Sequence, residues 1–240
     1  MVSHDASQSG FAYRFEWGED GLVALASAPD VDVVVVVDVL RFSTAVSVVV
    51  ERGGVAAPRR LDEACVDREP SDELSPAVLL AEPELDRVTI GSANGSRLAM
   101  LPGELGVPFV LAGCPRNASA TAHRARTLAG GDGAIAVIAA GERWPDGRLR
   151  VAVEDLIGAG AVLEAIDPSA ASSPPCGSPE ALAARAAFVD ARPALAATVG
   201  ATASARELVA RGHGRDVEIA LELGRARCAA QLVDDAFVAV

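Results

Sequence analysis

Lysine is absent from this chain of 240 residues, so all 21 fixed cationic side chains are arginines. Compositional bias toward arginine codons accounts for the absence, but the chemical consequence remains. A protein without lysine cannot form a lysine Schiff base or use a lysine-dependent phosphate loop. Histidine is also scarce, with 3 residues, and none of the 4 cysteines form a Cys-x-x-Cys pair. This scarcity excludes the usual zinc-binding patterns.

The chain also lacks an apolar run long enough to cross a membrane, and no basic region followed by an apolar run opens it. We therefore expect a cytoplasmic protein with free thiols and no membrane partner. The net charge is −12, with an isoelectric point near 4.7. Such a surface repels nucleic-acid phosphates, so we expect no nucleic-acid partner. An anionic ligand would need local arginines, helix N-termini or a metal ion to offset this field.

Apolar segments alternate with helical patterns along the chain. Residues 31–40 are almost continuous valine, which is typical of a strand buried on both faces of a parallel sheet. We expect further strands near 11–17, 87–90, 107–111 and 134–140, and helices near 43–52, 78–80, 97–101, 117–128, 151–166, 179–190 and 203–211. The predicted class is α/β, with a largely parallel central sheet and helices on both faces. We expect one domain over 1–240, with the option of a smaller C-terminal lobe from about 167.

Polar residues follow several of the predicted strands. In a parallel sheet, ligands gather at the carboxyl ends of the strands, so these segments are predicted to share one site. The segments are Asp38 to Thr44, Ser92 to Ser96, Gly113 to Asn117, and Gly141-Glu142 with Glu154-Asp155 downstream.

Each of these residues has a structural and a functional interpretation. Asp38 ends an apolar strand, where a carboxylate serves equally well as a helix cap or as a group paired with a metal or an arginine. Arg41 either clamps a phosphate or pairs with Asp38. The hydroxyls of Ser43 and Thr44 either cap the next helix or present donors to an anion.

The Asn94-Gly95 pair is typical of a tight turn, but between Ser92 and Ser96 it makes a small polar loop with room for an oxyanion. Asn117 is predicted at a helix start, where asparagine more often serves as an N-cap than as a ligand-binding residue.

Glu154 and Asp155 begin a predicted helix, where acidic residues favour the positive end of the helix dipole. Adjacent carboxylates also suit Mg²⁺, which prefers hard oxygen ligands. Composition and spacing thus predict an α/β enzyme-like site with carboxylates, arginine and hydroxyls, without naming a reaction.

Six motifs in this order resemble the 2-phosphosulfolactate phosphatase family, of the coenzyme M biosynthesis type. That family carries D-V-L-R-[AF]-[ST]-[ST], N-S-P, T-T-N-G-T, G-x-x-x-N-A, an A-G followed by acidic residues, and S-x-x-x-x-L-x-x-x-G-x-x-x-D-[IV]. The matching segments here are Asp38 to Thr44, Leu74-Ser75-Pro76, Ser92 to Ser96, Gly113 to Ala118, Ala140-Gly141 with Glu154-Asp155, and Ser204 to Val217. Together they cover residues 11–225 approximately. Two departures, Leu74 for Asn and Ala93 for Thr, lie in the loops that would shape a pocket.

The resemblance implies Mg²⁺-dependent hydrolysis of a phosphate monoester on a small anionic hydroxy acid, most simply 2-phosphosulfolactate. It also implies a cytoplasmic homo-oligomer, a dimer. The predicted catalytic residues are Asp38, Arg41, Asn94 and Glu154, and the predicted metal ligands are Asp38, Glu154 and Asp155. Asp38 could instead be the nucleophile that forms an aspartyl-phosphate, and Glu154 or Asp155 the general acid or base. The predicted substrate-binding residues are Ser43, Thr44, Ser75, Ser92, Gly95, Ser96 and Asn117. A catalytically inactive relative that binds an anionic metabolite is the alternative function.

Overall fold

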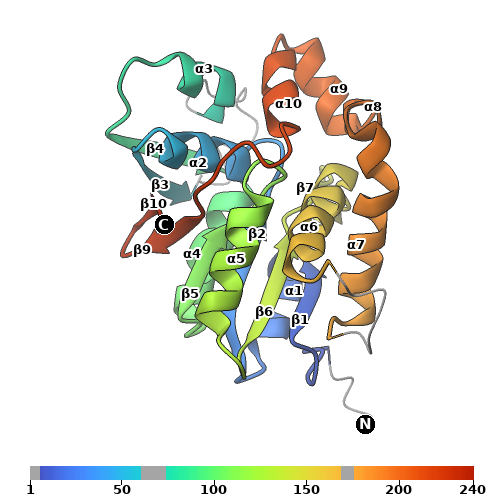
Figure 1. The fold of residues 1–240 in the computed structure, drawn as a ribbon. Coiled ribbons are helices and arrows are strands. Elements are labelled where there is room, and N and C mark those ends of the chain that lie inside the picture. The colour runs from blue at the N-terminus through green and yellow to red at the C-terminus, as the bar shows by residue number, and fades with distance from the viewer. Residues whose placement is uncertain (1–5, 61–73, 169–175) are drawn as a thin grey trace.

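The computed structural model describes residues 6–60, 74–168 and 176–240. Its centre is an eight-stranded sheet in the order β1-β6-β2-β5-β9-β10-β3-β4 (Figure 1). Strands β1, β6, β2 and β5 pair in parallel, as do β3 and β4. The predicted α/β class with a largely parallel sheet is therefore confirmed. In sheet order the strands are Tyr13–Trp17, Ala134–Ala139, Val31–Val37, Phe109–Ala112, Ala230–Val233, Ala236–Ala239, Val55–Arg60 and Arg87–Ser92.

The valines of β2 explain why helices cover both faces. Successive side chains of a strand point to opposite faces, so a strand with helices on either side must be apolar throughout. Val33, Val35 and Val37 pack with apolar residues of α5 (Ala118–Ala129), α6 (Val153–Ile166) and α7 (Pro179–Ala191). Val34 and Val36 pack with those of α1 (Gly18–Ala26), α2 (Phe42–Glu51) and α4 (Gly95–Glu104). The helices on both faces that the sequence predicted are present.

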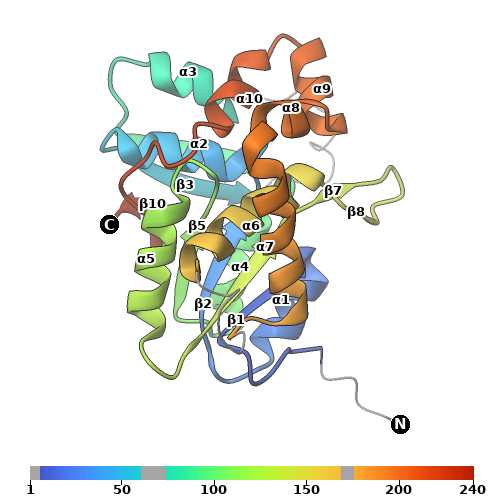
Figure 2. The same cartoon turned by 45° about the vertical axis from the view of Figure 1, so that its right-hand side comes forward.

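Helices of the C-terminal part lie across one end of the parallel strands. In both ribbon views α8 (Leu195–Gly200), α9 (Ala203–Ala210) and α10 (Gly214–Ala220) lie above the strand ends (Figures 1 and 2). Helix α10 packs against α3 (Pro76–Ala81), and a short 3₁₀ turn, Arg192–Ala194, joins α7 to α8. The chain then returns to the sheet as the hairpin β9–β10, between β5 and β3. Over the described ranges, no helix has both the length and the apolar composition of a membrane span.

Several short elements had no clear signal in the sequence. They are α1, β3, α8, α10 and the two-stranded hairpin of β7 (Glu142–Arg143) and β8 (Leu149–Arg150). Strand β3 reads VAAPRR and lies in a stretch, 55–73, that looked polar and weakly periodic. The hairpin β7–β8 projects from the body of the molecule (Figure 2). Residues 61–73 and 169–175 lie outside the described residues.

The direction of β4 corrects one expectation about the site. The strand-end loops were expected to meet because all strands of the sheet would be parallel. Three antiparallel pairings, β5 with β9, β9 with β10 and β10 with β3, separate the β3–β4 pair from β5. The loop after β4 therefore does not share the carboxyl edge of β2 and β6 through strand direction. Ser92 and Gly95 of this loop nevertheless contact Asp38, and helix α4, which follows the loop, packs against β2 and β5.

Candidate functional site

Asp38 lies between the N-termini of two helices. It follows β2, and one carboxylate oxygen accepts a hydrogen bond from the Phe42 N–H at the start of α2 (3.2 Å). The other oxygen accepts from the Gly95 N–H at the start of α4 (3.1 Å) and from the Ser92 hydroxyl (3.2 Å). The first contact is the capping role considered for Asp38, and the second joins α4 to the end of β2. Both helix N-termini favour a negative charge at this point.

Gly95 allows the two helices to approach this closely. A Cβ atom at this position would lie 2.5 Å from a ring carbon of Phe42 and 2.6 Å from a carboxylate oxygen of Asp38. Distances this short are not tolerated, so a larger residue would push α4 away from Asp38. Gly95 thus lets its backbone N–H donate to the Asp38 carboxylate. The sequence predicted that Gly95 binds substrate.

Arg41 and Asp216 form a buried ion pair that connects three segments. The Nη1 atom of Arg41 donates to one oxygen of Asp216, and Arg41 is only 2% exposed. The other oxygen of Asp216 accepts from the Ser75 hydroxyl (2.7 Å) and the Ala77 N–H (2.9 Å) at the start of α3. Arg41 was predicted to pair with Asp38 or with phosphate. Asp216 was not among the predicted site residues, although the closing motif of the family contains it.

The second terminal nitrogen of Arg41, Nη2, is buried without a hydrogen-bond partner in the described part of the chain. A buried donor left unpaired costs about 1–3 kcal/mol, so such an atom calls for an explanation, and a bound anion or water molecule is one. The Arg41 guanidinium therefore has an unsatisfied N–H at the head of α2, one turn of chain beyond Asp38.

Four carboxyl groups gather around the ends of β2 and β6. Asp155, in the first turn of α6, accepts from the Val39 N–H (2.7 Å) and the Gly141 N–H (2.9 Å), so it ties together the loops after these strands. Glu154 is 3% exposed and makes no hydrogen bond or ion pair to the residues that the structure describes. Glu142 begins the hairpin β7–β8 and completes the group with Asp38.

Burial and mutual repulsion make these carboxyl groups hard to ionise together. Burial raises the pKa of Asp38 to about 6, and the Glu154 charge adds to this while hydrogen bonds to Asp38 oppose it. Burial, then the Asp38 charge, raises the pKa of Glu142 to about 7. Burial, then the charges of Asp38 and Glu154, raises the pKa of Asp155. A cation beside them would relieve this repulsion.

The carboxylates described here suit Mg²⁺ better than a metal ion that needs three or more protein ligands. Within residues 6–60, 74–168 and 176–240, no three Asp, Glu, His or Cys side chains form a metal-binding group. Mg²⁺ is usually held by one or two carboxylates, with water and substrate phosphate completing its shell. No described donor forms a hydrogen bond with the Glu154 carboxylate, and the charge of Glu154 contributes to the raised pKa of Asp38. Asp38 and Glu154 are therefore the candidates to hold such an ion.

Residues 73–235 match the family model described as 2-phosphosulpholactate phosphatase. The matched stretch is more than half of the chain. The chain belongs to this family. No curated protein matches the chain.

The family match begins after Asp38 and Arg41, so these two residues are linked to the matched region through contacts. Asp38 accepts hydrogen bonds from Ser92 and Gly95, and Arg41 pairs with Asp216. All three partners lie within the matched residues 73–235. The structure thus joins the first motif of the sequence to the part of the chain that identifies the family.

Several predicted substrate-binding side chains form hydrogen bonds with backbone groups. Ser43, Thr44 and Ser96 donate their hydroxyls to the carbonyl oxygens of Val36 (3.0 Å), Val39 (2.8 Å) and Ile90 (2.9 Å), respectively. The Asn117 amide donates to the Ala112 carbonyl and accepts from the Cys114 N–H, at 2.9 Å each. Ser75 caps α3 and donates to Asp216. These side chains hold the loops around the site, and sequence patterns could not separate that role from substrate binding.

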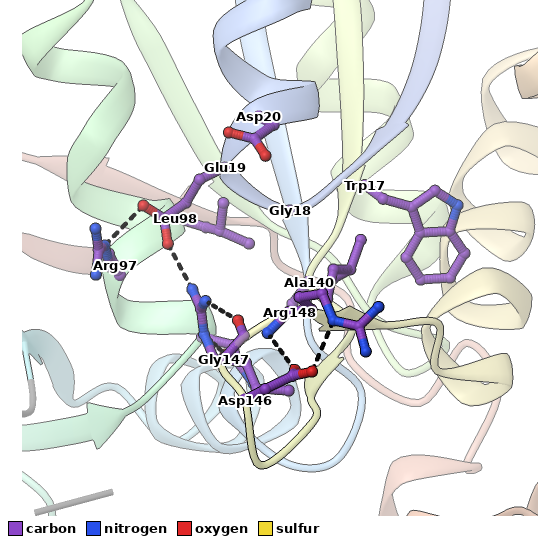
Figure 3. A pocket seen from close by; sticks show the side chains of 13 residues that line it. Trp17, Gly18, Glu19, Asp20, Arg97, Leu98, Ala140, Asp146, Gly147 and Arg148 are labelled. Atoms are coloured by element: carbon purple, nitrogen blue, oxygen red, sulfur yellow. Dashed lines mark hydrogen bonds and ion pairs between the residues drawn. The ribbon is translucent and has the colours of Figure 1, made fainter. Parts of the chain in front are cut away.

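Asn94 faces the hairpin β7–β8 rather than Asp38. Its amide donates to Glu142 (3.4 Å), and its oxygen accepts from the Nε atom of Arg143 (3.2 Å). Of the predicted site residues, Asn94 alone lines a pocket of about 640 Å³ between α1, α4 and the hairpin. Figure 3 shows two ion pairs at this pocket: Glu19 of α1 pairs with Arg97 of α4, and Asp146 pairs with Arg148 within the hairpin. Since these charges already have partners, the pocket lies beside the carboxylates and is not itself a ready anion site.

Proposed function

We propose that the protein hydrolyses a phosphate monoester of a small anionic hydroxy acid with the help of Mg²⁺, and that its substrate is 2-phosphosulfolactate. The family membership supports phosphatase chemistry, since that activity gives the family its name. The donor set around Asp38 and Glu154 supports the choice of metal ion.

The observation that carries the proposal is the unpaired Nη2 of Arg41. A buried guanidinium whose other nitrogen is held by Asp216 has a fixed orientation, so its remaining N–H groups are aimed before any ligand arrives. Arginine binds phosphoryl oxygens through such planar, paired donors. In the proposed complex a phosphoryl oxygen satisfies Nη2.

In the reaction that we propose, the oxygen of a water molecule bonds to phosphorus while the ester P–O bond breaks. One proton of that water ends on the departing alkoxide oxygen, so the products are the hydroxy acid and phosphate. The transition state of phosphoryl transfer is loose, and enzymes contribute mainly positioning and charge stabilisation. Arg41 would supply both, because its donors face the phosphoryl oxygens whose charge must be held in the transition state.

Asp38 and Glu154 would hold the Mg²⁺ ion, which when bound supplies positive charge to the phosphoryl oxygens and offsets the carboxylate cluster. The hydrogen bonds from α2 and α4 would fix the Asp38 carboxylate in place. Asp155 keeps both of its oxygens on backbone N–H groups, so its contribution would be to hold the loops that carry Asp38 and Glu142.

The test is phosphate release from a panel of esters, with Mg²⁺ and with a chelator. The panel contains 2-phosphosulfolactate, 2-phospholactate, the phosphate ester of 2-hydroxyethanesulfonate, and p-nitrophenyl phosphate. We expect Mg²⁺-dependent release that is fastest with 2-phosphosulfolactate. Saturable binding of 2-phosphosulfolactate without phosphate release from any ester would instead establish an inactive relative that binds an anionic metabolite.

The role of Arg41 is tested in the same assay. Arg41→Ala should lower kcat by about 100-fold or more, because removing one donor to the transition-state charge has effects of this size. Arg87→Ala is the matched control, since Arg87 is a half-exposed arginine that pairs with Asp235 at the surface. Near-native turnover of Arg41→Ala would refute the assignment.

A further inference from the structure

Arg150 lies at the end of the hairpin β7–β8, next to the carboxylate cluster. Its guanidinium carbon lies 5.9 Å from the ring centroid of Trp144, which is 50% exposed, and its Nη2 atom donates to the Ser204 hydroxyl (3.3 Å). Ser204 belongs to α9, so Arg150 spans the space between the hairpin and the C-terminal helices. The segments that meet here are far apart in sequence.

Arg150 forms no ion pair with the residues that the structure describes, although Glu142 lies opposite it in the hairpin. No carboxylate of the described residues lies within ion-pairing distance of Arg150, although the chain has 33 acidic residues and 21 arginines. Its two contacts, an aromatic ring and a hydroxyl, are neutral. The nearby Glu207 of α9 pairs with Arg211 (2.6 Å) instead. Arg150 thus keeps a full positive charge and most of its five N–H donors for another group.

The hairpin pairing places this charge near the loops of the proposed phosphate site. Arg150 lies opposite Glu142, which accepts a hydrogen bond from the Asn94 amide (3.4 Å), and the N–H of the next residue, Gly95, donates to Asp38. Burial and the Asp38 charge raise the pKa of Glu142, and the Arg150 charge acts against both. The charges of Asp38 and Arg150 thus both act on the Glu142 carboxyl group, in opposite directions.

We propose that Arg150, oriented by Trp144 and Ser204, binds a second oxyanion of the substrate, a carboxylate or a sulfonate separate from the phosphate. This inference rests on the proposed function and names the class of substrate, an organic phosphate with at least one further acidic group. The cation–π contact with Trp144 restrains the guanidinium, whose remaining N–H donors can match two oxygens of an oxyanion. The hydrogen bond to Ser204 restrains the guanidinium further.

The experiment compares Arg150→Gln with Arg148→Gln on the ester panel. Arg148 lies on the same hairpin, is 79% exposed and pairs with Asp146, so its loss removes an equal charge without touching the subsite. We expect Arg150→Gln to lower kcat/KM for 2-phosphosulfolactate by about 10- to 100-fold, mostly through KM, since hydrogen bonds to charged groups have this worth. The same variant should change kcat/KM for p-nitrophenyl phosphate, which has no second oxyanion, by less than about 3-fold.

The two single-acid esters identify the oxyanion. A loss confined to 2-phospholactate assigns the carboxylate to Arg150, and a loss confined to the 2-hydroxyethanesulfonate ester assigns the sulfonate. Arg150→Lys should restore part of the lost kcat/KM, since it keeps the charge but not the paired donors. An equal loss on all four esters, or no loss on any, would overturn the inference.

Binding keeps this inference separable from the proposed function. If the wild-type protein releases phosphate from none of the esters, the proposed function fails. Calorimetric titration of 2-phosphosulfolactate into the Mg²⁺-loaded protein then tests Arg150 alone. A dissociation constant raised at least about 10-fold in Arg150→Gln and unchanged in Arg148→Gln would uphold the subsite, whereas equal affinities would refute it.

Discussion

Removing the carboxylate of Asp216 should destabilise the whole fold. Asp216 is fully buried and receives donors from Arg41, from the Ser75 hydroxyl and from the Ala77 N–H. In Asp216→Ala these donors lose their acceptor, and one of them carries a buried charge. Breaking a buried ion pair by removing one partner costs about 3–5 kcal/mol. For a chain of this size each kcal/mol lowers Tm by about 2–4 °C, so we expect a loss of about 6–20 °C.

Urea denaturation followed by circular dichroism measures the loss of unfolding free energy. Asp235→Ala is the matched control, because Asp235 also pairs with an arginine but is 79% exposed, and surface pairs contribute about 0–1 kcal/mol. Ser75→Ala should fall between the two, since it removes one donor and leaves the ion pair in place. A loss for Asp216→Ala no larger than that for Asp235→Ala would refute the view that Asp216 holds Arg41, α3 and α10 together.

Two further predictions concern Asp38. Gly95→Ala should lower the activity, and it should lower the unfolding free energy by about 1–3 kcal/mol, because the added Cβ would meet Phe42 and Asp38. Gly103→Ala is the control in the same denaturation and turnover assays, since a Cβ at Gly103 would have no atom within 4 Å. The pKa values of Asp38 (about 6) and Glu142 (about 7) are raised by burial, so the protein without Mg²⁺ should be most stable below pH 4 with respect to these groups and lose that stability as pH rises to 7. Mg²⁺ should accordingly raise Tm more at pH 8 than at pH 5 in a thermal-shift assay, and an equal rise at both would contradict the cation site.

The contacts of the hairpin and the C-terminal helices show that sequence motifs indicated only part of the site. The closing motif of the sequence, Ser204 to Val217, contains both Asp216 and Ser204. The structure places Asp216 against Arg41 and Ser204 against Arg150. Motif order alone indicated that this segment belonged with the others, but gave no role to either side chain.

The sequence by itself determined the fold class and the neighbourhood of the site. A run of valines with no polar interruption can only be buried on both faces, so β2 predicted helices on either side of a parallel sheet. The polar residues after β2 and β6 then had to meet at one edge. Local patterns sufficed for these conclusions because burial and strand direction leave a signal in adjacent residues.

Tertiary structure alone decided which polar side chains already have hydrogen-bond partners within the protein. The partners of Arg41 and Asp155 are 175 and 116 residues away, and no local pattern encodes such a contact. The hydroxyls of Ser43 and Thr44 looked available but bind backbone carbonyls, whereas Nη2 of Arg41 remains unpaired. The loop after β4 contacts Asp38 although three antiparallel pairings separate the β3–β4 pair from β5. Each result depends on where a side chain points after distant segments pack, which composition and spacing do not specify.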